Sequence, residues 1–353
     1  MLDQLAAATV ALGLTVVLTG VVRLVAARFD VLDHPGGRKT HPLPTPNLGG
    51  VAVALATFGM TGAGALFGLA KLLDGMGPML GASGAICLLG LVDDLWQLGP
   101  RTRLVVETAA ALVVVSAAGL SLGTGLLAAV WIVFITNAFN LLDNSDGAMG
   151  TVAAVTSLGL VGCAIAEARP GFALLLTVLS AALTGFLLHN WHPAKIFLGD
   201  CGSLFTGFLL ASSAVTVHAD APGPQFLAEL LALTVVVVTD TLLVLVSRRR
   251  AGRSLLCGGT DHIAHRLRRI GLMPPHSAAV LGLTSLIGAV MALLIHDGRL
   301  PPAAVVPFAL VVPITIVLLL RVPVYEPRSA NQNTETATPF NTVAAADPGG
   351  EPG

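Results

Sequence analysis

The chain has 353 residues, of which 54% are hydrophobic and only 11% are charged, whereas about a quarter of the residues in an ordinary soluble domain are charged. This much apolar surface cannot be hidden in a water-soluble core, so the composition excludes a soluble globular domain and indicates a lipid environment. The formal net charge of −1 is uninformative as a total, and the placement of the charges carries the information instead.

A helix needs roughly 20 apolar residues to cross the hydrocarbon core of a bilayer, and eleven segments approach or reach this length. They lie near residues 5–25, 48–70, 78–92, 104–120, 122–142, 152–167, 171–189, 203–218, 226–246, 277–296 and 301–320. The third and sixth segments are short, so we expect eleven spans with a margin of about one. Because the alternating ten-residue pattern of a membrane β-barrel is absent, the sequence predicts an all-α, polytopic membrane protein.

The first apolar segment is predicted to be an uncleaved membrane span and not a secretory signal peptide. It lacks a basic region at its start, where Asp3 lies instead, and positive charge follows at Arg23 and Arg28. A cleavable signal peptide has the opposite arrangement, with its basic residues before the apolar run. The chain therefore begins with a helix that stays in the membrane.

Lysine and arginine collect in alternate connections between the predicted spans. Of the 19 lysines and arginines, only Lys71, Arg169 and Arg299 fall on the other face. The cytoplasmic loops of membrane proteins carry the excess of positive charge, so the basic face is predicted to be cytoplasmic. This places the N-terminus outside and the C-terminus in the cytoplasm.

The cysteines give no sign of a redox or metal framework. The chain contains Cys87, Cys163, Cys201 and Cys257. Two of them fall in predicted spans, and no pair has C-x-x-C spacing. We therefore expect neither a set of disulfides nor a thiolate metal site.

The end of the chain differs in composition from the rest. Residues 322–353 are polar and rich in proline, glycine, alanine and threonine, which is typical of a disordered segment. The predicted organisation is an integral membrane domain over residues 1–321, followed by a disordered cytoplasmic tail over residues 322–353.

Four polar segments on the predicted cytoplasmic face stand out, and the first contains Asp93 and Asp94 at the end of the third span. Two adjacent carboxylates that emerge from an apolar helix repel each other and are costly to desolvate. The arrangement becomes favourable if a cation or a basic residue lies nearby. The alternative is that both carboxylates are simply hydrated at a helix end.

The second segment repeats short polar residues at three-residue intervals, with Asn137, Asn140, Asp143 and Asp146 at the end of the fifth span. At this spacing the side chains follow one side of a helix. All of them offer oxygen ligands, which suit a hard cation such as Mg²⁺ and not zinc. The alternative is a C-terminal cap that ends at Gly147, but such a cap explains neither Asn137 nor Asn140.

The third segment is a tight glycine turn around Asp200 that opens the eighth span. A helix N-terminus that follows glycines presents free N–H groups to an anion, and Asp200 beside it could hold a metal that bridges to that anion. The alternative is that Ser203 is the N-cap of the helix and that Asp200 only favours the helix dipole.

The fourth segment combines His262, His265 and Arg266 with Asp261. Histidine and arginine together favour phosphate or pyrophosphate recognition. The alternative is a basic segment that pairs with anionic membrane lipid, as residues 248–250 are expected to do. A zinc pair is disfavoured, because no third soft ligand accompanies the two histidines.

With these four polar segments in this order and on one face, the chain resembles the polyprenyl-phosphate N-acetylhexosamine-1-phosphate transferases. The resemblance covers roughly residues 1–320. The first loop, DHPGGRKTHPLPTPNLGG, is similar to the D-x-P-x-x-R-K-x-H…P-x-P-x-x-G-G loop of the GlcNAc-1-phosphate branch. The motifs VDD, N-x-x-N-x-x-D-x-x-D-G and N-x-x-P-A-K-x-F-x-G-D-x-G-S follow, and then Asp240-Thr241 before the basic loop. Five motifs in register make the resemblance specific.

The resemblance implies a role for each matching residue. Asp93 and Asp94 match an acidic pair of which one member deprotonates or orients the lipid phosphate, while Asp200 matches the metal ligand, with Asn140 beside it. The implied substrate-binding residues are Asp143, Asp146, Asn190, Phe197, Arg103, His262, His265, Arg266, Lys39 and His41. Among these, Asn190 and Phe197 match positions near the uracil ring.

Two motifs depart from the family pattern. The common D-G-x-D-G reads Asp143-Asn144-Ser145-Asp146-Gly147, which bears on the turn beside the nucleotide pocket. The common H-x-H-H reads His262-Ile263-Ala264-His265, so one histidine is missing. Because that loop meets the sugar in the family, the identity of the sugar is the least determined expectation.

The resemblance implies transfer of a HexNAc-1-phosphate, with GlcNAc-1-phosphate expected, from a UDP-sugar to polyprenyl phosphate with release of UMP. Such a reaction initiates cell-envelope glycan synthesis at the cytoplasmic face of a bacterial inner membrane. The expected cofactor is Mg²⁺, with Mn²⁺ as the substitute. The expected partners are UDP-HexNAc, polyprenyl phosphate and membrane lipid, with no nucleic acid, and a homodimer is left open.

Two other classes of protein share some of these features. A secondary transporter could use carboxylates at the membrane edge as a proton relay, but it would place polar residues near the midplane, where only Asp240 is expected. An ion partner inside the protein would explain Asp240. An intramembrane aspartyl protease would need Gly-x-Gly-Asp, and Phe197 replaces the first glycine.

Overall fold

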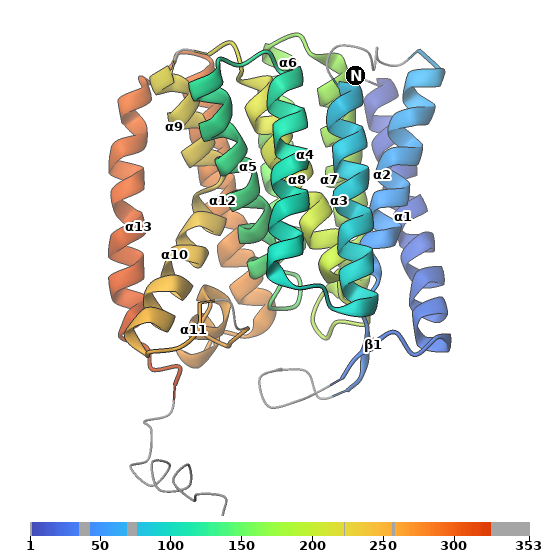
Figure 1. Ribbon diagram of the computed structural model, residues 1–353, viewed down its shortest axis with the longest axis vertical. Coiled ribbons are helices and arrows are strands. Elements are labelled where there is room, and N and C mark those ends of the chain that lie inside the picture. The colour runs from blue at the N-terminus through green and yellow to red at the C-terminus, as the bar shows by residue number, and fades with distance from the viewer. Residues whose placement is uncertain (1, 35–42, 69–75, 222, 256–257, 326–353) are drawn as a thin grey trace, which may run out of the picture.

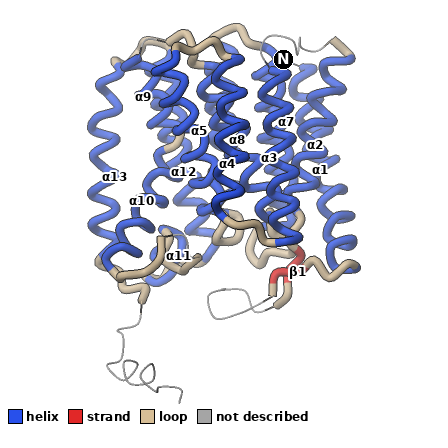
Figure 2. Tube along the Cα trace, in the orientation of Figure 1, coloured by secondary structure: helices blue, strands red, loops and turns tan. Residues whose placement is uncertain are grey.

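The computed structural model describes residues 2–34, 43–68, 76–221, 223–255 and 258–325. Within these ranges the chain is a bundle of long helices that run roughly along one axis (Figure 1). The strands β1 (Leu32–Asp33) and β2 (Thr45–Pro46) form a minimal antiparallel pair at one end of the bundle (Figure 2). The predicted all-α class is confirmed.

The helices are α1 (Leu2–Arg28), α2 (Gly49–Leu66), α3 (Met76–Trp96), α4 (Pro100–Ala117), α5 (Leu122–Leu142), α6 (Ala148–Ala166), α7 (Pro170–Asn190), α8 (Gly199–Val217), α9 (Gly223–Leu233), α10 (Val235–Arg250), α11 (Ile263–Arg269), α12 (Pro274–His296) and α13 (Val305–Leu320), with a 3₁₀ turn at Pro302–Ala304. Most helices that are neighbours in the sequence run in opposite directions along the bundle (Figure 1), whereas α9 and α10 follow one bent path.

Each of the eleven predicted spans coincides with a helix or with the α9–α10 pair. In the described part of the chain, nine helices are long and apolar enough to cross a membrane, and the α9–α10 pair brings the number to ten. Helix α4 differs because it carries Arg101, Arg103 and Glu107. The polytopic character is thus supported by the structure, while the orientation in the membrane stays a prediction.

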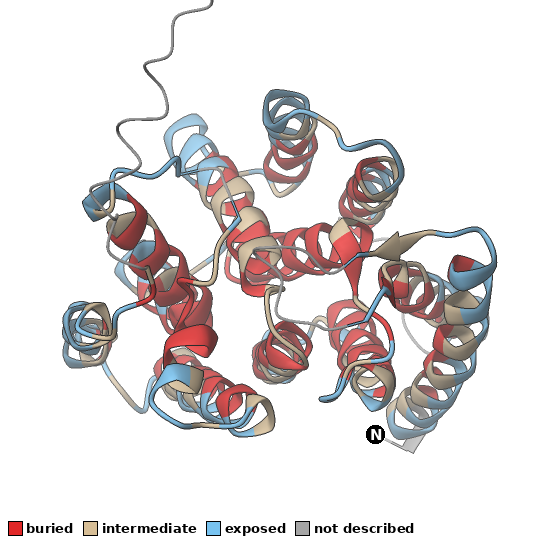
Figure 3. Cartoon of the chain, turned by 90° about the horizontal axis from the view of Figure 1, so that it is seen from below, coloured by how far each residue is buried: buried red, intermediate tan, exposed pale blue. Residues whose placement is uncertain are grey.

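Helix α8 forms the centre of the bundle, and 94% of its membrane-length segment is buried, against 6% for the peripheral helix α13. Buried residues accordingly gather in the middle of the molecule when it is viewed along the bundle (Figure 3). The exposed leucines and valines on the outer helices face the space that lipid would fill. The start of α8 is therefore held by helices on all sides.

Glycines let two helices approach the start of α8 more closely than any other residue would. A Cβ on Gly50 of α2 would meet the backbone of Gly202, and a Cβ on Gly90 of α3 would meet the backbone of Asp200. Small residues at helix crossings are a common device in membrane proteins, because packing replaces the hydrophobic effect there. These contacts fix the position of Asp200.

The ninth predicted span, at residues 226–246, is not one helix. Its axis bends by 73° between α9 and α10, and Thr234 at the break has the non-helical angles φ −112° and ψ 11°. The Thr234 hydroxyl donates to the carbonyl of Leu230 at 2.6 Å, and a run of four valines follows at residues 235–238. Back-bonding hydroxyls and β-branched side chains both weaken a helix, which explains the break.

Candidate active site

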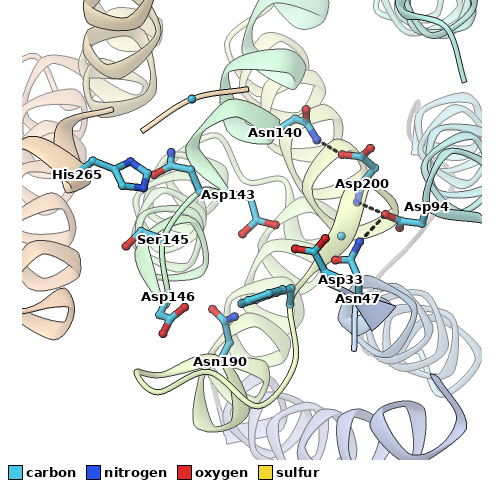
Figure 4. A pocket seen from close by; sticks show the side chains of 14 residues that line it. Asp33, Asn47, Asp94, Asn140, Asp143, Ser145, Asp146, Asn190, Asp200 and His265 are labelled. Atoms are coloured by element: carbon cyan, nitrogen blue, oxygen red, sulfur yellow. Dashed lines mark hydrogen bonds between the residues drawn. The ribbon is translucent and has the colours of Figure 1, made fainter. Parts of the chain in front are cut away.

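A cavity of about 320 Å³ opens at the end of the bundle where α3, α5 and α7 end and α8 begins (Figure 4). Its lining residues are Asp33, Asn47, Asp94, Asn140, Asp143, Asn144, Ser145, Asp146, Asn190, Phe197, Gly199, Asp200, Gly259 and His265. Five of these are aspartates, and no lysine or arginine is among the described residues that line the cavity. The site is thus rich in oxygen donors and poor in positive charge.

Asp94 holds the N-terminus of α8. Its Oδ1 accepts the backbone N–H of Asp200 at 2.8 Å and the side-chain N–H of Asn47 at 3.2 Å, and its Oδ2 accepts the N–H of Cys201 at 2.9 Å. Gly199 has φ +75°, and a Cβ there would lie 2.7 Å from the Asp94 carboxylate. The N–H groups expected to be free for an anion are therefore donated in part to Asp94.

The residue at which α8 begins tests the alternative interpretation of Ser203 as the N-cap of this helix. The helix begins at Gly199, so Ser203 lies inside its first turns and its hydroxyl donates back to the Gly199 carbonyl at 2.9 Å. The interpretation of Ser203 as the N-cap is wrong. Ser203 instead accepts a hydrogen bond from Asn140 at 2.8 Å, and so helps to orient that amide.

Arg103, in the first turn of α4, bridges three elements behind the cavity. Its Nη1 lies 2.7 Å from Asp93 Oδ2 and 3.5 Å from Asp200 Oδ2, and its Nη2 donates to Asn140 Oδ1 at 3.1 Å. Asp93 also accepts the backbone N–H of Leu98. Of the predicted acidic pair, Asp94 lines the cavity, whereas Asp93 is buried against Arg103 and faces away from it.

Asn140 and Asp200 lie together at the base of the cavity (Figure 4). The amide of Asn140 donates to Asp200 Oδ1 at 2.5 Å. The Asp200 side chain is 32% exposed, so it can still reach a ligand. The predicted pair of metal residues is therefore brought together by α5 and α8, which pack side by side.

Asp143 and Asp146 lie on the turn between α5 and α6. Burial raises the pKa of Asp143 to about 7, and the negative charges of Asp200 and Asp146 act in the same direction. Asp146 accepts the backbone N–H of Ala194 at 3.1 Å and lies 2.7 Å from His192 Nδ1. The turn thus keeps both carboxylates at the cavity, although its sequence departs from the common D-G-x-D-G pattern.

Asn190 ties this turn to the loop that follows α7. Its Oδ1 accepts the N–H of Gly147 at 3.0 Å, and its amide donates to the Ile196 carbonyl at 2.9 Å. Gly147 has φ +71°, a conformation that glycine adopts without strain. Asn190 and the nearby Phe197 both line the cavity, as expected for residues predicted beside a nucleotide base.

The histidine loop contributes His265 to the cavity but not His262. His262 Nδ1 lies 2.8 Å from Asp240 Oδ2, and Asp240 Oδ1 accepts the N–H of Ile263 at 2.7 Å. Asp240, which was expected to have an ion partner inside the protein, is therefore paired with His262. Burial lowers the pKa of His265 to about 4, and His262 adds to this shift, so His265 is neutral near pH 7.

Arg266 is predicted as a substrate contact, whereas the structure uses it to fasten the end of α13. Its Nη1 donates to the carbonyls of Leu319 at 2.8 Å and Val322 at 2.7 Å, and its Nε donates to the Asp261 carbonyl at 3.0 Å. Its Nη2 donates to the hydroxyl of Ser247 at 2.6 Å. Arg266 is buried and does not line the cavity, so its role here is structural.

Lys39 and His41 lie outside the described residues, as does the predicted tail from residue 326 onward. The described chain continues to Tyr325, whose hydroxyl donates to Asp261 at 2.6 Å. The ordered part therefore extends at least four residues past the predicted boundary at residue 321.

Three residues at or beside the site were not among the predicted site residues, although two of them, Asp33 and Asn47, belong to the first loop motif. Asp33 and Asn47 line the cavity from the connection between α1 and α2. Glu107 of α4 is fully buried behind it and accepts a hydrogen bond from Asn137, which therefore does not face the cavity. A signal for Glu107 was present, since a carboxylate four residues after Arg103 in an apolar helix needs a partner.

The side chains around the cavity fit a hard divalent cation. Asp33, Asp143 and Asp200 point toward a common space (Figure 4), and carboxylate and amide oxygens are the donors that Mg²⁺ prefers. Several carboxylates in a partly buried cavity repel one another unless a cation or protons compensate them. Of the two residues predicted to hold the cation, Asp200 offers its carboxylate to this space, whereas Asn140 directs its NH₂ to Asp200 and Ser203 and its oxygen to Arg103.

Comparison with known proteins supports a transferase site. Residues 76–218 match the family model described as glycosyl transferase family 4. A provisionally named glycosyltransferase of Streptomyces coelicolor is 43% identical over 332 residues, which cover 94% of this chain and 80% of the relative. The decaprenyl-phosphate N-acetylglucosaminephosphotransferase of Mycolicibacterium smegmatis is 32% identical over 354 residues, covering 87% and 86%.

A protein of the same name from Mycobacterium tuberculosis is 33% identical over 301 residues, which cover 73% of this chain and 74% of the relative. The matched family region runs from the start of α3 to the end of α8 and so contains Asp94, Asn140, Asp143 and Asp200. These similarities extend over most of both chains. The chain therefore belongs to glycosyl transferase family 4, the family of polyprenyl-phosphate N-acetylhexosamine-1-phosphate transferases.

Proposed function

We propose that this protein transfers GlcNAc-1-phosphate from UDP-GlcNAc to polyprenyl phosphate and releases UMP. The observation that carries the proposal is the cavity at the end of a membrane bundle, lined by five aspartates and by no lysine or arginine among its described residues. A diphosphate donor can enter such a cavity only together with a divalent cation, because its own charge has the same sign. The names of the relatives, which include decaprenyl-phosphate N-acetylglucosaminephosphotransferases, support the same reaction.

The reaction exchanges one pyrophosphate bond for another. An oxygen of the lipid phosphate attacks the β-phosphorus of the UDP-sugar, and the bond from that phosphorus to the bridging oxygen breaks. The electron pair of the broken bond stays on that oxygen, which leaves as part of UMP. Because the bonds made and broken are alike, the reaction is close to thermoneutral, and the barrier is mainly repulsion between anions.

When bound, Mg²⁺ neutralises the charge that develops on the diphosphate. Asp200 would hold it, and Asn140, whose amide donates to the Asp200 carboxylate, would keep that carboxylate in place. Arg103 lies directly behind this pair and can turn a guanidinium N–H toward a phosphate oxygen without leaving Asp93. Positive charge thus reaches the reacting phosphates from behind the cavity.

Asp94 serves the reaction by positioning Asp200. Both of its oxygens accept N–H groups, so it has little capacity left to take a proton from the substrate. The lipid phosphate is already largely ionised near neutral pH, because the second pKa of a phosphate monoester is about 6. A single in-line displacement without a general base is therefore the mechanism we favour.

We further propose that the cavity faces the cytoplasm of a bacterial cell and that the reaction initiates a cell-envelope glycan. The excess of lysine and arginine in the connections at this end supports this orientation. The donor would arrive from the aqueous side, and the lipid phosphate would arrive between the helices.

The experiment uses membranes that contain the protein, polyprenyl phosphate, Mg²⁺ and a panel of labelled UDP-sugars. We expect UMP and a lipid-linked product with UDP-GlcNAc, and neither without Mg²⁺. Membranes with the Asp200→Asn variant provide the matched control, since this change removes one charge and keeps the shape. Absence of UMP with every UDP-HexNAc would reject the proposal, and product from another UDP-sugar would correct the sugar alone.

A further inference from the structure

A second cluster of polar side chains lies at the end of the bundle opposite the cavity. It consists of Cys163 near the end of α6, His218 just after α8, Glu229 in α9 and His296 at the end of α12. Figure 1 shows the end of α6 and the start of α9 at the top of the bundle, far from α11 and β1 at the bottom. The cluster is therefore separate from the site described above.

The four side chains are buried. Cys163, His218 and Glu229 are at most 1% exposed, and the side chain of His296 is 5% exposed. The candidate ligand atoms of Cys163, His218 and His296 all lie within 4.8 Å of one another. Glu229 Oε2 lies 3.0 Å from His218 Nε2, and Glu229 Oε1 lies 3.3 Å from His296 Nδ1.

These separations are close to those around a metal ion. With metal–ligand bonds of about 2.0–2.3 Å, the ligand atoms of a tetrahedral zinc site lie roughly 3.3–3.8 Å apart. The two separations that involve Glu229 are 3.0 and 3.3 Å. The separations among Cys163, His218 and His296, which reach up to 4.8 Å, need an inward movement of about 1 Å, which side-chain rotation can supply.

The polar atoms of the cluster lack the hydrogen bonds that burial demands. His218 Nε2, Glu229 Oε2 and His296 Nδ1 are buried and have no hydrogen-bond partner among the residues that the structure describes. The two imidazole nitrogens lie near the Glu229 carboxylate, but not at the angles of a hydrogen bond. An unsatisfied buried polar atom costs about 1–3 kcal/mol, so three of them together point to a missing ligand.

Each of the two histidines has an oxygen of a neighbouring residue close to one of its ring nitrogens, which leaves the other ring nitrogen for a metal. His218 Nδ1 lies 2.7 Å from the Ala214 carbonyl, which can only accept. Nδ1 therefore carries the proton, and Nε2 of the neutral ring presents its lone pair toward Glu229, an arrangement that is repulsive without a cation between them. His296 Nε2 lies 3.4 Å from Glu167 Oε1. Carbonyl and carboxylate partners of this kind are typical of metal-bound histidines.

We propose that Cys163, His218, Glu229 and His296 bind one Zn²⁺ ion that fastens this end of the bundle. A thiolate, two imidazoles and a carboxylate form a mixed set that suits zinc and not Mg²⁺. Four protein ligands leave no open position, which is typical of a structural site. The ion would join α6, α8, α12 and the short helix α9, which is otherwise separated from α10 by the break at Thr234.

The sequence pattern did not reveal this site, and the expectation of no thiolate metal site was drawn from spacing alone. The four ligands are far apart in the chain, at residues 163, 218, 229 and 296. Only the packing of four helices brings them together. Glu167 has a side chain that is 40% exposed, so an ion can enter from the aqueous side at this end.

The first experiment measures zinc in the full-length protein, purified in detergent without chelators or metal-affinity resin after growth with ZnCl₂. We expect about one zinc ion per chain in the wild type and less than about a tenth of that after Cys163→Ala plus His296→Ala. Cys87→Ala is the matched control, because Cys87 lies away from the cluster beside Cys201, and it should keep the ion. The proposal is wrong if the wild type contains no zinc or if the double variant retains it.

The second experiment guards against a double variant that does not fold. Glu167 is partly exposed and contacts His296 without being a ligand, so Glu167→Gln should fold and weaken zinc binding about 10–100-fold. Added ZnCl₂ should raise the unfolding temperature of the metal-free wild type at a lower concentration than that of Glu167→Gln. Equal responses of the two proteins, or no response to ZnCl₂, would instead show that the cluster is a protonated histidine–glutamate network.

Discussion

The carboxylate of Asp94 accepts the backbone N–H of Asp200 at 2.8 Å and thereby links the last turns of α3 to the first residues of α8. The same carboxylate accepts the N–H of Cys201 at 2.9 Å, in the manner of an N-cap supplied by another helix. Asp200 in turn contacts Asn140 and Arg103. The position of the proposed metal ligand thus depends on a residue that does not itself need to touch the substrate.

We expect Asp94→Asn to weaken Mg²⁺ binding more than it slows the chemical step. An asparagine can accept only through one oxygen, so its NH₂ would face an N–H at the start of α8 and loosen Asp200. We predict a rise of about tenfold or more in the Mg²⁺ concentration needed for half-maximal UMP release, because losing a charged acceptor costs about 1.5–3 kcal/mol. The measurement is a Mg²⁺ titration of UMP release at fixed substrate.

The same titration separates positioning from proton transfer. If Asp94 only positions Asp200, saturating Mg²⁺ should restore most of kcat in the Asp94→Asn variant. A kcat that stays low at every Mg²⁺ concentration would instead identify Asp94 as a general base. Asp93→Asn is a useful comparison, since Asp93 contacts Arg103 and does not line the cavity.

Asp200→Asn and Asp143→Asn should affect different steps. Asp200, the proposed metal ligand, lies beside Asn140, so its substitution is expected to abolish both UMP release and the dependence on Mg²⁺. Asp143 lies on the turn beside the nucleotide pocket, so its substitution should mainly raise KM for the UDP-sugar. Steady-state kinetics of both purified variants would show the difference, and full activity of Asp200→Asn would contradict the metal assignment.

Arg103 should be replaceable by lysine but not by methionine. The guanidinium contacts Asp93, Asp200 and Asn140 together, whereas an ammonium keeps the charge without the fork that bridges them. We expect Arg103→Lys to retain activity within about tenfold and Arg103→Met to lose about 100-fold, since a charged hydrogen bond contributes about 1.5–3 kcal/mol. Comparable kcat/KM values for the two variants would contradict a phosphate contact at this position.

The local motifs predicted the residue types of the site, and packing decided which way each side chain faces. Asp94, Asn140, Asp143 and Asp200 were predictable, because short oxygen donors are costly at the ends of apolar helices and indicate a polar ligand there. Asp93 could not be separated from Asp94 by the sequence. That assignment depends on α3 continuing to Trp96, beyond the predicted end at residue 92.

The other differences between the sequence-based predictions and the structure also arise from contacts between residues that are far apart in the chain. Arg266 fits a phosphate-binding pattern, but the carbonyls at the end of α13 use its guanidinium. The zinc cluster involves residues that are ordinary in their own segments, such as Glu229 and His296. A sequence pattern reports neighbours within a few turns of one helix, and these contacts join helices that are far apart in the chain.

The stability of the protein should fall as the pH is lowered from about 6.5 toward 4, in part because of His265. Burial lowers the pKa of this imidazole to about 4 in the folded state, against 6.5 in the unfolded chain, so the unfolded state binds more protons between these values. Stability therefore rises with pH across this window. The His265→Gln variant should show a smaller loss of unfolding temperature between pH 7 and pH 5 than the wild type. An equal loss in both proteins would show that the pKa of His265 is the same in the folded and in the unfolded chain.

Gly90→Ala should damage the active site although it replaces glycine in a helix by a better helix former. The new Cβ would overlap the backbone of Asp200, so α3 and α8 must move apart and carry Asp94 away from the N–H groups that it accepts. The matched control is Gly81→Ala in the same helix, where a Cβ would meet nothing within 4 Å. There the substitution should be neutral or stabilising by up to about 1 kcal/mol.

We expect UMP release to fall about 100-fold or more in Gly90→Ala and to stay unchanged in Gly81→Ala, at equal amounts of folded protein. If Gly90→Ala kept wild-type activity, the close contact between α3 and α8 would not be what positions Asp200.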